Sequence, residues 1–276
     1  MTIRIVTDTT CDLPERVIQE LDIIRVPLYI NIGDKGFLDG IDISRKDFYD
    51  NLADFPVHPT TGTPGPAAFK MVYQDLINSG ADEILSIHIS ESLSATVTVA
   101  QSTAQEFPKV TVVDSGQLSL GTGFQVELAA KMAQVGAKID EILDALINLR
   151  ARTFVTAGID TLEFLRRSGR MNRFMSGLGS LLQLKPILTM RDGQPGSDRV
   201  RTSLKAEKRL VSLLEEHLPL EKFALLHTNA EEKANSFMKT IANLLPSERY
   251  YSMNITPVIG AHIGPGAFGF AIVKKE

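Results

Sequence analysis

The sequence predicts an α/β protein of two domains, and three observations support this. Short apolar runs alternate with helix-length segments through the first half, which is typical of a mainly parallel sheet. After residue 152 the pattern changes to a hairpin-like stretch followed by helices and further strands, which favours a mixed sheet. The 276 residues, 43% of them apolar, are enough for two cores. We therefore expect one α/β domain over residues 1–152 and another over 153–276.

The first half supplies alternating strands and helices. Strands are expected over residues 3–6, 23–30, 84–89 and 110–113. Helices are expected to about residues 20 and 52 and over 67–78, 94–106, 123–134 and 140–152. Asp12 is expected to cap the first helix, with Pro14 in its first turn, and Ser44 with Asp47 resembles a capping box for the second.

The second half is read in the same way. The stretch "LTMRDGQPGSDRVR" has the turn residues of a hairpin, and "FALLH", "RYYSMNI" and "FGFAIVK" are expected to be strands. Helices with a period of 3.6 are expected over residues 203–217 and 230–245.

Composition excludes several classes of partner. The net charge is −4 and there is no dense block of Lys and Arg, so neither nucleic acid nor anionic membrane is expected to be the main partner. No apolar run approaches the roughly eighteen residues of a membrane span, so stable membrane insertion is not expected. The chain begins directly with the strand-like "IRIV" and has a single cysteine, Cys11, which indicates a cytoplasmic protein.

The sequence lacks the common motifs for nucleotide and metal binding. There is no G-x-x-x-x-G-K-[ST] loop and no dinucleotide glycine fingerprint after the first strand. The five histidines lack metal-ligand spacing, and one cysteine cannot build a thiolate site. We expect neither a nucleotide, a metal nor another cofactor.

A cluster of hydroxyl side chains follows the expected strand 84–89. Ser90, Ser92, Ser94 and Thr96 lie where the carboxyl end of a strand meets the start of a helix, with Ser94 in the first helical turn. Free N–H groups and the helix dipole favour an anion there. A simple N-cap is the structural alternative, but it needs only one hydroxyl. The surplus could bind a carboxylate or a phosphate.

A second candidate is the stretch "HPTTGTPGPAAF". Pro64 and Pro66 stiffen it and would hold Thr61 or Thr63 in a fixed direction. The structural alternative is that Thr63 simply caps the helix that follows.

Two further candidates come from the second half. His262 lies in a glycine-rich loop before the last strand, where it could donate a hydrogen bond to a ligand or could be structural. The segment "FLRRSGRMNR" carries four arginines, which could contact phosphates or an acidic partner, or could form a solvated helix end. An acyl-transfer dyad of Ser94 and His262 is conceivable, although no G-x-S-x-G surrounds the serine.

Seven motifs occur in an order that resembles the DegV family, and they span the whole chain. They are "TDTTCDLP", "TGTPGP", "ISESLSAT", "VVDSGQLSLGTG", "DTLEFLRRSGR", "LLQLKPIL" and "HIGPGAFG". The resemblance implies two α/β domains with a long-chain fatty acid between them. It also implies a non-catalytic carrier that presents the acid's carboxyl group to a separate ATP-dependent fatty-acid kinase, which makes acyl-phosphate for phospholipid synthesis.

The resemblance also implies roles for individual residues. Thr61, Ser94 and His262 would bind the fatty-acid carboxylate, with Gly62 and Ala95 beside them, and Arg170 would contact the kinase. Four positions depart from the usual family forms. "TGTP" at residues 61–64 stands where "TSQP" is common, which changes positions 62 and 63, and Ala95 and Ser168 stand where glycine is common. Because Gly62 stands where that form has serine, the loop offers one hydroxyl donor fewer at this position.

An acyl chain needs a long apolar tunnel. A chain of about sixteen carbons would gain on the order of 12 kcal/mol from buried methylenes, at roughly 0.8 kcal/mol each, before the costs of binding. The candidate lining residues, which could equally be ordinary core, are Phe174, Met175, Leu178, Leu181 and Leu182. Two other functions stay open: a serine-dependent acyl hydrolase or transferase using Ser94 and His262, and a carrier of a different anion.

Overall fold

Two large sheets organise the chain, and the computed structural model describes residues 2–174, 184–246 and 250–276 of it. The first sheet has the strand order β2-β1-β6-β7, and each pair of neighbours is parallel. Its strands are β1 (Ile3–Asp8), β2 (Ile24–Val26), β6 (Glu83–His88) and β7 (Val110–Asp114). The mainly parallel sheet predicted for the first half is therefore confirmed.

The second sheet has the order β10-β9-β8-β13-β11-β12. Strands β11 and β12 are parallel, and the pairs from β10 through β9, β8 and β13 to β11 are antiparallel. The strands are β8 (Thr153–Gly158), β9 (Lys185–Arg191), β10 (Gln194–Val200), β11 (Leu220–His227), β12 (Tyr251–Asn254) and β13 (Phe268–Lys274). The predicted mixed sheet is confirmed, and the predicted hairpin is β9 with β10.

A small antiparallel sheet, in the order β4-β3-β5, was not predicted. It consists of β3 (Tyr29–Ile32), β4 (Lys35–Leu38) and β5 (Thr60–Gly62). The single strand expected over residues 23–30 was wrong, because the chain leaves the first sheet after β2 and enters the small sheet at β3. Pro27 lies between them and has no amide hydrogen for a ladder hydrogen bond.

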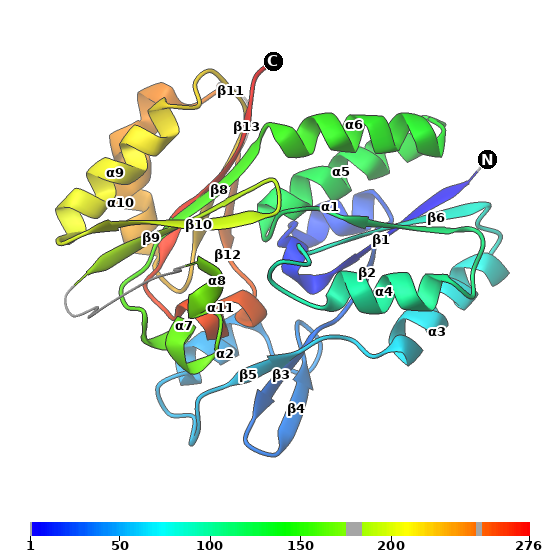
Figure 1. Cartoon of the computed structure of the whole chain (residues 1–276), viewed down its shortest axis with the longest axis horizontal. Helices are drawn as coiled ribbons and strands as arrows, with labels where there is room; N and C mark the ends of the chain where they lie inside the picture. The colour runs from blue at the N-terminus through cyan, green and yellow to red at the C-terminus, as the bar shows by residue number, and fades with distance from the viewer. Residues whose placement is uncertain (1, 175–183, 247–249) are drawn as a thin grey trace.

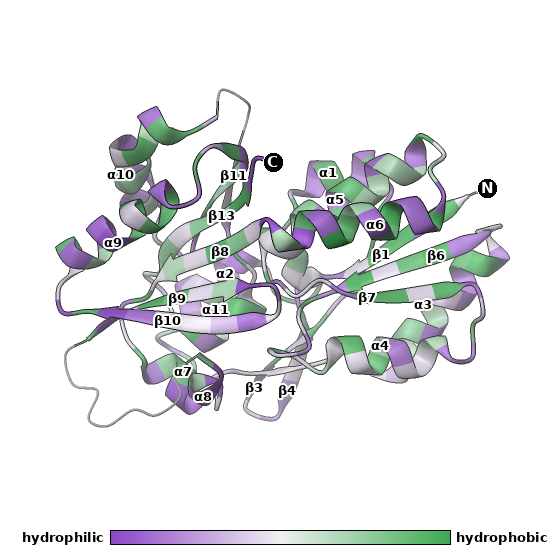
Figure 2. Ribbon diagram, turned by 45° about the horizontal axis from the view of Figure 1, so that its top comes forward, coloured by the Kyte–Doolittle hydropathy of each residue, from purple (hydrophilic) through white to green (hydrophobic). Residues whose placement is uncertain are grey.

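Helices cover the sheets (Figure 1). One face of the first sheet carries α1 (Glu15–Glu20), α5 (Leu120–Gln134) and α6 (Ile139–Ala151), and the other carries α3 (Pro66–Asn78) and α4 (Thr96–Ala104). Outside the second sheet lie α9 (Ser203–Glu215) and α10 (Glu231–Ile241), in which hydrophilic and hydrophobic residues alternate (Figure 2). The remaining helices are α2 (Arg45–Asn51), α7 (Glu163–Arg167), α8 (Met171–Phe174) and α11 (Pro257–Ile263), with 3-10 turns η1 (Thr9–Cys11) and η2 (Ala242–Leu244).

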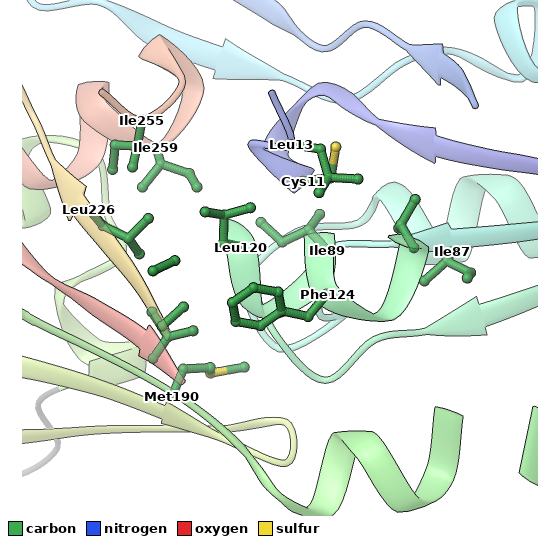
Figure 3. Packing of buried hydrophobic residues seen from close by; sticks show 14 of the residues in the cluster. Cys11, Leu13, Ile87, Ile89, Leu120, Phe124, Met190, Leu226, Ile255 and Ile259 are labelled. Carbon is green, nitrogen blue, oxygen red and sulfur yellow. The ribbon is translucent and has the colours of Figure 1, made fainter. Parts of the chain in front are cut away.

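Both faces of the second sheet are buried. Successive side chains along a strand point to opposite faces, so neighbouring residues pack into different clusters. Phe154 and Leu225 pack with the outer helices, whereas their neighbours Val155 and Leu226 pack with residues of the first half. Figure 3 shows Leu226, Ile255 and Ile259 facing Leu120 across this shared core. The two halves of the chain are therefore joined by one hydrophobic cluster.

Helix starts test the capping expectations. Ser44 caps α2 as predicted, since its Oγ accepts a hydrogen bond from the Asp47 N–H at 3.0 Å. Asp12 does not cap α1, because the N-cap of this helix is Pro14. The Asp12 carboxylate instead accepts hydrogen bonds from Ser119 and Thr256. Among the helices that the structure describes, none is long and apolar enough to cross a membrane.

Candidate functional site

A cavity of about 390 Å³ lies where the small sheet, the first sheet and α11 meet. Six separate stretches of chain line it: the residue before β3, the end of β5, the loop after β6, the residues before α5, the segment of α7 and α8, and α11. The lining residues are Leu28, Thr61, Gly62, Thr63, Ile89, Leu93, Ser94, Ala95, Leu118, Leu165, Arg170, Arg173, Phe174, Val258, Ile259, His262 and Ile263. The set contains every residue to which the family resemblance gave a role, whereas the other candidates Ser90, Ser92, Thr96, Arg166 and Arg167 do not line the cavity.

The predicted acyl-chain lining is only partly described. Phe174 ends α8 and lines the cavity, and its carbonyl oxygen accepts a hydrogen bond from Ser197 Oγ on β10 at 2.9 Å. Met175, Leu178, Leu181 and Leu182 lie outside the described residues.

Thr61 and His262 are brought together from opposite ends of the sequence. Thr61 Oγ1 lies 2.8 Å from His262 Nε2. Thr61 is on β5, held by pairing with Ile30 of β3, rather than on the loop expected. His262 is in the last turn of α11, not in a glycine-rich loop; Gly264 follows as the C-cap at a φ of 77°.

His262 is held neutral. Burial, and then the positive charges of Arg170, His58 and Arg173, lower its pKa from 6.5 to about 3. Within the described chain its Nδ1 is buried without a hydrogen-bond partner. If Nε2 carries the proton, His262 donates to Thr61 and leaves the Thr61 hydroxyl free to donate into the cavity. In this arrangement the neutral imidazole orients the Thr61 hydroxyl, which can then donate to an anion.

Ser94 lies just before α4 rather than in its first turn. The helix begins at Thr96 with Ala95 as its N-cap, and alanine has no side-chain oxygen to accept from the first N–H groups. Ser94 Oγ lies 2.8 Å from Thr96 Oγ1. The helix N-terminus and a hydroxyl therefore adjoin the cavity together, as expected for an anion site. Similarly, α3 is capped by Gly65, so the alternative role of Thr63 as its cap was wrong.

The loop that carries Ser94 is anchored by a buried hydrogen-bonded chain that sequence reasoning missed. Asp8 accepts from the Ile89 N–H at 3.1 Å and lies 2.9 Å from His88 Nδ1, and His88 Nε2 lies 2.7 Å from Ser86 Oγ. These three side chains have no exposed surface, so the Ser-His-Asp series fixes the loop and is inaccessible to a substrate. The i, i+2 spacing of Ser86 and His88 was its only signal.

The four arginines divide into two pairs. Arg166 and Arg167 are exposed and hydrogen-bond to Glu163. Arg170 and Arg173 line the cavity. Arg170 Nη1 donates to the Ser168 carbonyl at 2.8 Å and its Nε is buried without a partner in the described structure, while Arg173 Nη1 donates to the Ser92 carbonyl. Only the second pair adds positive charge at the cavity.

A smaller, almost wholly apolar cavity of about 50 Å³ continues inward between α11 and the second sheet. Leu118, Phe174, Ile259 and Ile263 line both cavities, so we call these four residues the neck. The inner walls include Val155, Leu188, Met190, Leu226, Ile255 and Ala267. Sequence reasoning did not place these at the site; the inward-facing apolar positions of the expected strands were the available signal.

The larger cavity nearby, of about 620 Å³, has a different character. It is lined by charged groups whose partners are already present, since Arg25 pairs with Glu15 and Arg45 with Asp12. None of the predicted site residues lines it. The described residues hold no cluster of three or more metal-ligating side chains.

Comparisons with known proteins agree with this architecture. The family model described as "Uncharacterised protein, DegV family" matches residues 2–275. A DegV domain-containing protein of Listeria innocua is 33% identical over 273 residues, covering 97% of this chain and 96% of that protein. One from Streptomyces coelicolor is 34% identical over 280 residues, covering 99% of each.

Solved structures match over the whole chain. A fatty-acid-binding DegV family protein from Thermus thermophilus superposes with a TM-score of 0.91 and is 34% identical, with both chains covered completely. DegV of Bacillus subtilis, described as a fatty acid binding protein, gives a TM-score of 0.90 at 27% identity, again with complete coverage of both. The resemblance seen in the seven motifs is confirmed, and the chain belongs to the DegV family.

Proposed function

We propose that this protein binds a long-chain fatty acid, with the carboxylate at Thr61, Ser94 and His262 and the acyl chain passing the neck into the inner cavity. The observation that carries the proposal is the sequence of two joined cavities, the outer with polar donors and the inner apolar. Fatty-acid binding by the Thermus thermophilus and Bacillus subtilis relatives supports it.

The donors match what a buried carboxylate requires. Desolvation makes an unpaired carboxylate costly, so it needs several convergent donors and favourable charge. Thr61 and Ser94 supply hydroxyls, Arg170 and Arg173 supply positive charge, and the N-terminus of α4 supplies a dipole. Gly62 and Ala95 lie beside them and contribute no side-chain donor.

The acyl chain accounts for the apolar inner cavity, which a small hydrophilic anion would not use. Phe174 and the other neck residues would contact its middle, and Met190 and Leu226 its far end. On this account the ligand lies between a domain of residues 1–152 and one of residues 153–276, since both halves supply walls.

We further propose that the protein is a cytoplasmic, non-catalytic carrier that presents the carboxyl group to a separate fatty-acid kinase, which forms acyl-phosphate for phospholipid synthesis. Arg170 would face that kinase from the cavity. A hydrolase using Ser94 and His262 is less well supported, because Ser94 Oγ lies against Thr96 and His262 Nε2 against Thr61. No observation favours catalysis by this chain alone.

The proposal is tested by calorimetric titration of delipidated protein with palmitate and with its methyl ester. Palmitate is expected to bind at least about tenfold more tightly, because only the free acid presents a charged group to the donors. Equal affinity would contradict the head-group assignment. Failure to bind either ligand, with binding of a small carboxylate or phosphate instead, would favour a carrier of a different anion.

A further inference from the structure

Asp12 is a buried carboxylate outside the cavities, with 1% of its surface exposed. It follows η1 with a φ of 55°, a left-handed conformation that aspartate tolerates better than most residues. Its Oδ2 accepts from Ser119 Oγ at 2.6 Å, and its Oδ1 accepts from the Thr256 N–H and from Arg45 Nη2, both at 2.9 Å. One carboxylate thus joins three separate stretches of chain.

Two of these stretches carry residues of the neck. Ser119 is the N-cap of α5 and directly follows Leu118. Thr256 is the N-cap of α11, which carries Ile259 and Ile263 one and two turns later. Because both stretches supply neck residues, a change in their separation would change the width of the neck. Asp12 is the group that bonds both.

The start of α11 depends on the first half of the chain. Asp39 Oδ2 accepts from Thr256 Oγ1 at 2.5 Å, Tyr49 Oη donates to the Ile255 carbonyl at 3.2 Å, and Arg45 Nη1 donates to the Asn254 carbonyl at 2.5 Å. α11 also contacts α2, β3 and β5. The position of α11 beside the inner cavity is therefore fixed by α2, Asp39 and the small sheet, all in the first half of the chain.

We propose that Asp12 is a positioning residue for the acyl tunnel: by bonding Ser119 and Thr256 together it sets the width of the neck and so governs binding of chains long enough to pass it. The inference rests on the proposed function. Ligands that remain in the outer cavity should not depend on Asp12.

Two variants and one control test this. Ser119→Ala removes one bond to Asp12 and leaves the charge, and Asp12→Asn keeps the shape but removes the charge that Arg45 faces. Thr153→Val is the matched control, because it deletes another fully buried hydroxyl, which donates to the Leu149 carbonyl of α6 instead. For each protein, affinities for palmitate and decanoate are measured together with the melting temperature.

Ser119→Ala and Asp12→Asn are each expected to bind palmitate about tenfold more weakly, the equivalent of losing one hydrogen bond to a charged group, and to bind decanoate within about twofold of wild type. The control should keep the wild-type ratio even if its melting temperature falls. A palmitate-to-decanoate ratio unchanged in Ser119→Ala and Asp12→Asn would overturn the inference. If wild-type protein binds neither acid, the proposed function itself fails.

A pH series adds a readout that a purely structural bond would not move. Burial raises the pKa of Asp12 to about 6, against the opposing effects of Arg45, Ser119 and Thr256. The charged or titratable groups that face it are Arg45, Asp39, Tyr49 and Cys11. The ratio of the association constants for palmitate and decanoate should fall in wild type as the pH drops through 6, and it should not change with pH in Asp12→Asn. A slope that persists in that variant would assign the effect to Asp39, whose pKa is also raised, and contradict the proposal.

Discussion

The hydroxyl groups of Thr61 and Ser94 at the outer cavity each have a hydrogen-bond partner within the protein. Thr61 is bonded to His262, and Ser94 to Thr96. A hydroxyl that accepts in its bond keeps its own proton, which it can donate to a carboxylate. Motif resemblance identified these residues, but their mutual contacts depend on a fold that joins positions 61 and 262, which no local pattern could specify.

Ser94→Ala should weaken palmitate binding about tenfold and should not abolish it, because one donor of several is lost. Ser92→Ala is the control in the same loop, since Ser92 Oγ lies against Ser90 and does not line the cavity. Calorimetry measures both. If wild-type protein formed a covalent acyl ester without a partner protein, and Ser94→Ala formed none, Ser94 would instead be a nucleophile.

Arg170→Ala should leave palmitate binding nearly intact and slow acyl-phosphate formation when a bacterial fatty-acid kinase and ATP are supplied. The reason is that Arg170 lines the cavity and is partly exposed, so its positive charge can face a phosphate or an acidic partner surface. Arg209→Ala on α9, which loses pairs with Asp198 and Glu216, is the control. Equal phosphorylation rates for the two variants would remove the proposed partner role.

His262 makes stability depend on pH in a defined direction. The pKa of His262 is about 3 in the folded protein, against 6.5 for a solvated histidine, so the unfolded chain takes up the proton first. The free energy of unfolding is therefore unaffected by this group above pH 6.5. It decreases as the pH falls from 6.5 towards 3, by up to about 1.4 kcal/mol per pH unit. Urea unfolding should show a shallower dependence for His262→Gln over this window. Parallel profiles would contradict the assignment.

At the scale of elements, the long periodic segments were predictable and the short ones were not. Helices α9 and α10 were recognised from their amphipathic pattern, with ends that differ by a few residues. α11 was missed because "PVIGAHI" is short and contains glycine, and tertiary hydrogen bonds from Asp12, Asp39 and Tyr49 hold it. β5 has three residues and exists through its pairing with β3.

The glycine in α11 is explained by the approach of α2. A Cβ at Gly260 would lie 2.1 Å from Tyr49 Oη, so Gly260→Ala should reduce the free energy of unfolding by roughly 1–3 kcal/mol and weaken palmitate binding by displacing His262. Gly65→Ala, with nothing within 4 Å, is the control and should change little. Partial recovery is expected on adding Tyr49→Phe, which removes the nearest atom. Equal unfolding energies for Gly260→Ala and Gly65→Ala would contradict this packing argument.

At the scale of the molecule, the sequence predicted a parallel and a mixed sheet because periodicity and turn residues are local signals. It did not predict that the two halves share one cluster, in which Leu120 meets Ile259, because such packing depends on how the sheets are placed (Figure 3). The cavity arises at that junction. Its walls could therefore be named only where a motif marked them.

The central claim, that a fatty acid is carried non-covalently at this junction, is tested most directly by mass spectrometry of the protein as purified from cells, first native and then denatured. We expect the native mass to exceed the chain mass by one long-chain fatty acid, and the denatured chain to be unmodified. A covalent acyl adduct on Ser94 would contradict the carrier account, as would an empty protein that also fails to take up added palmitate.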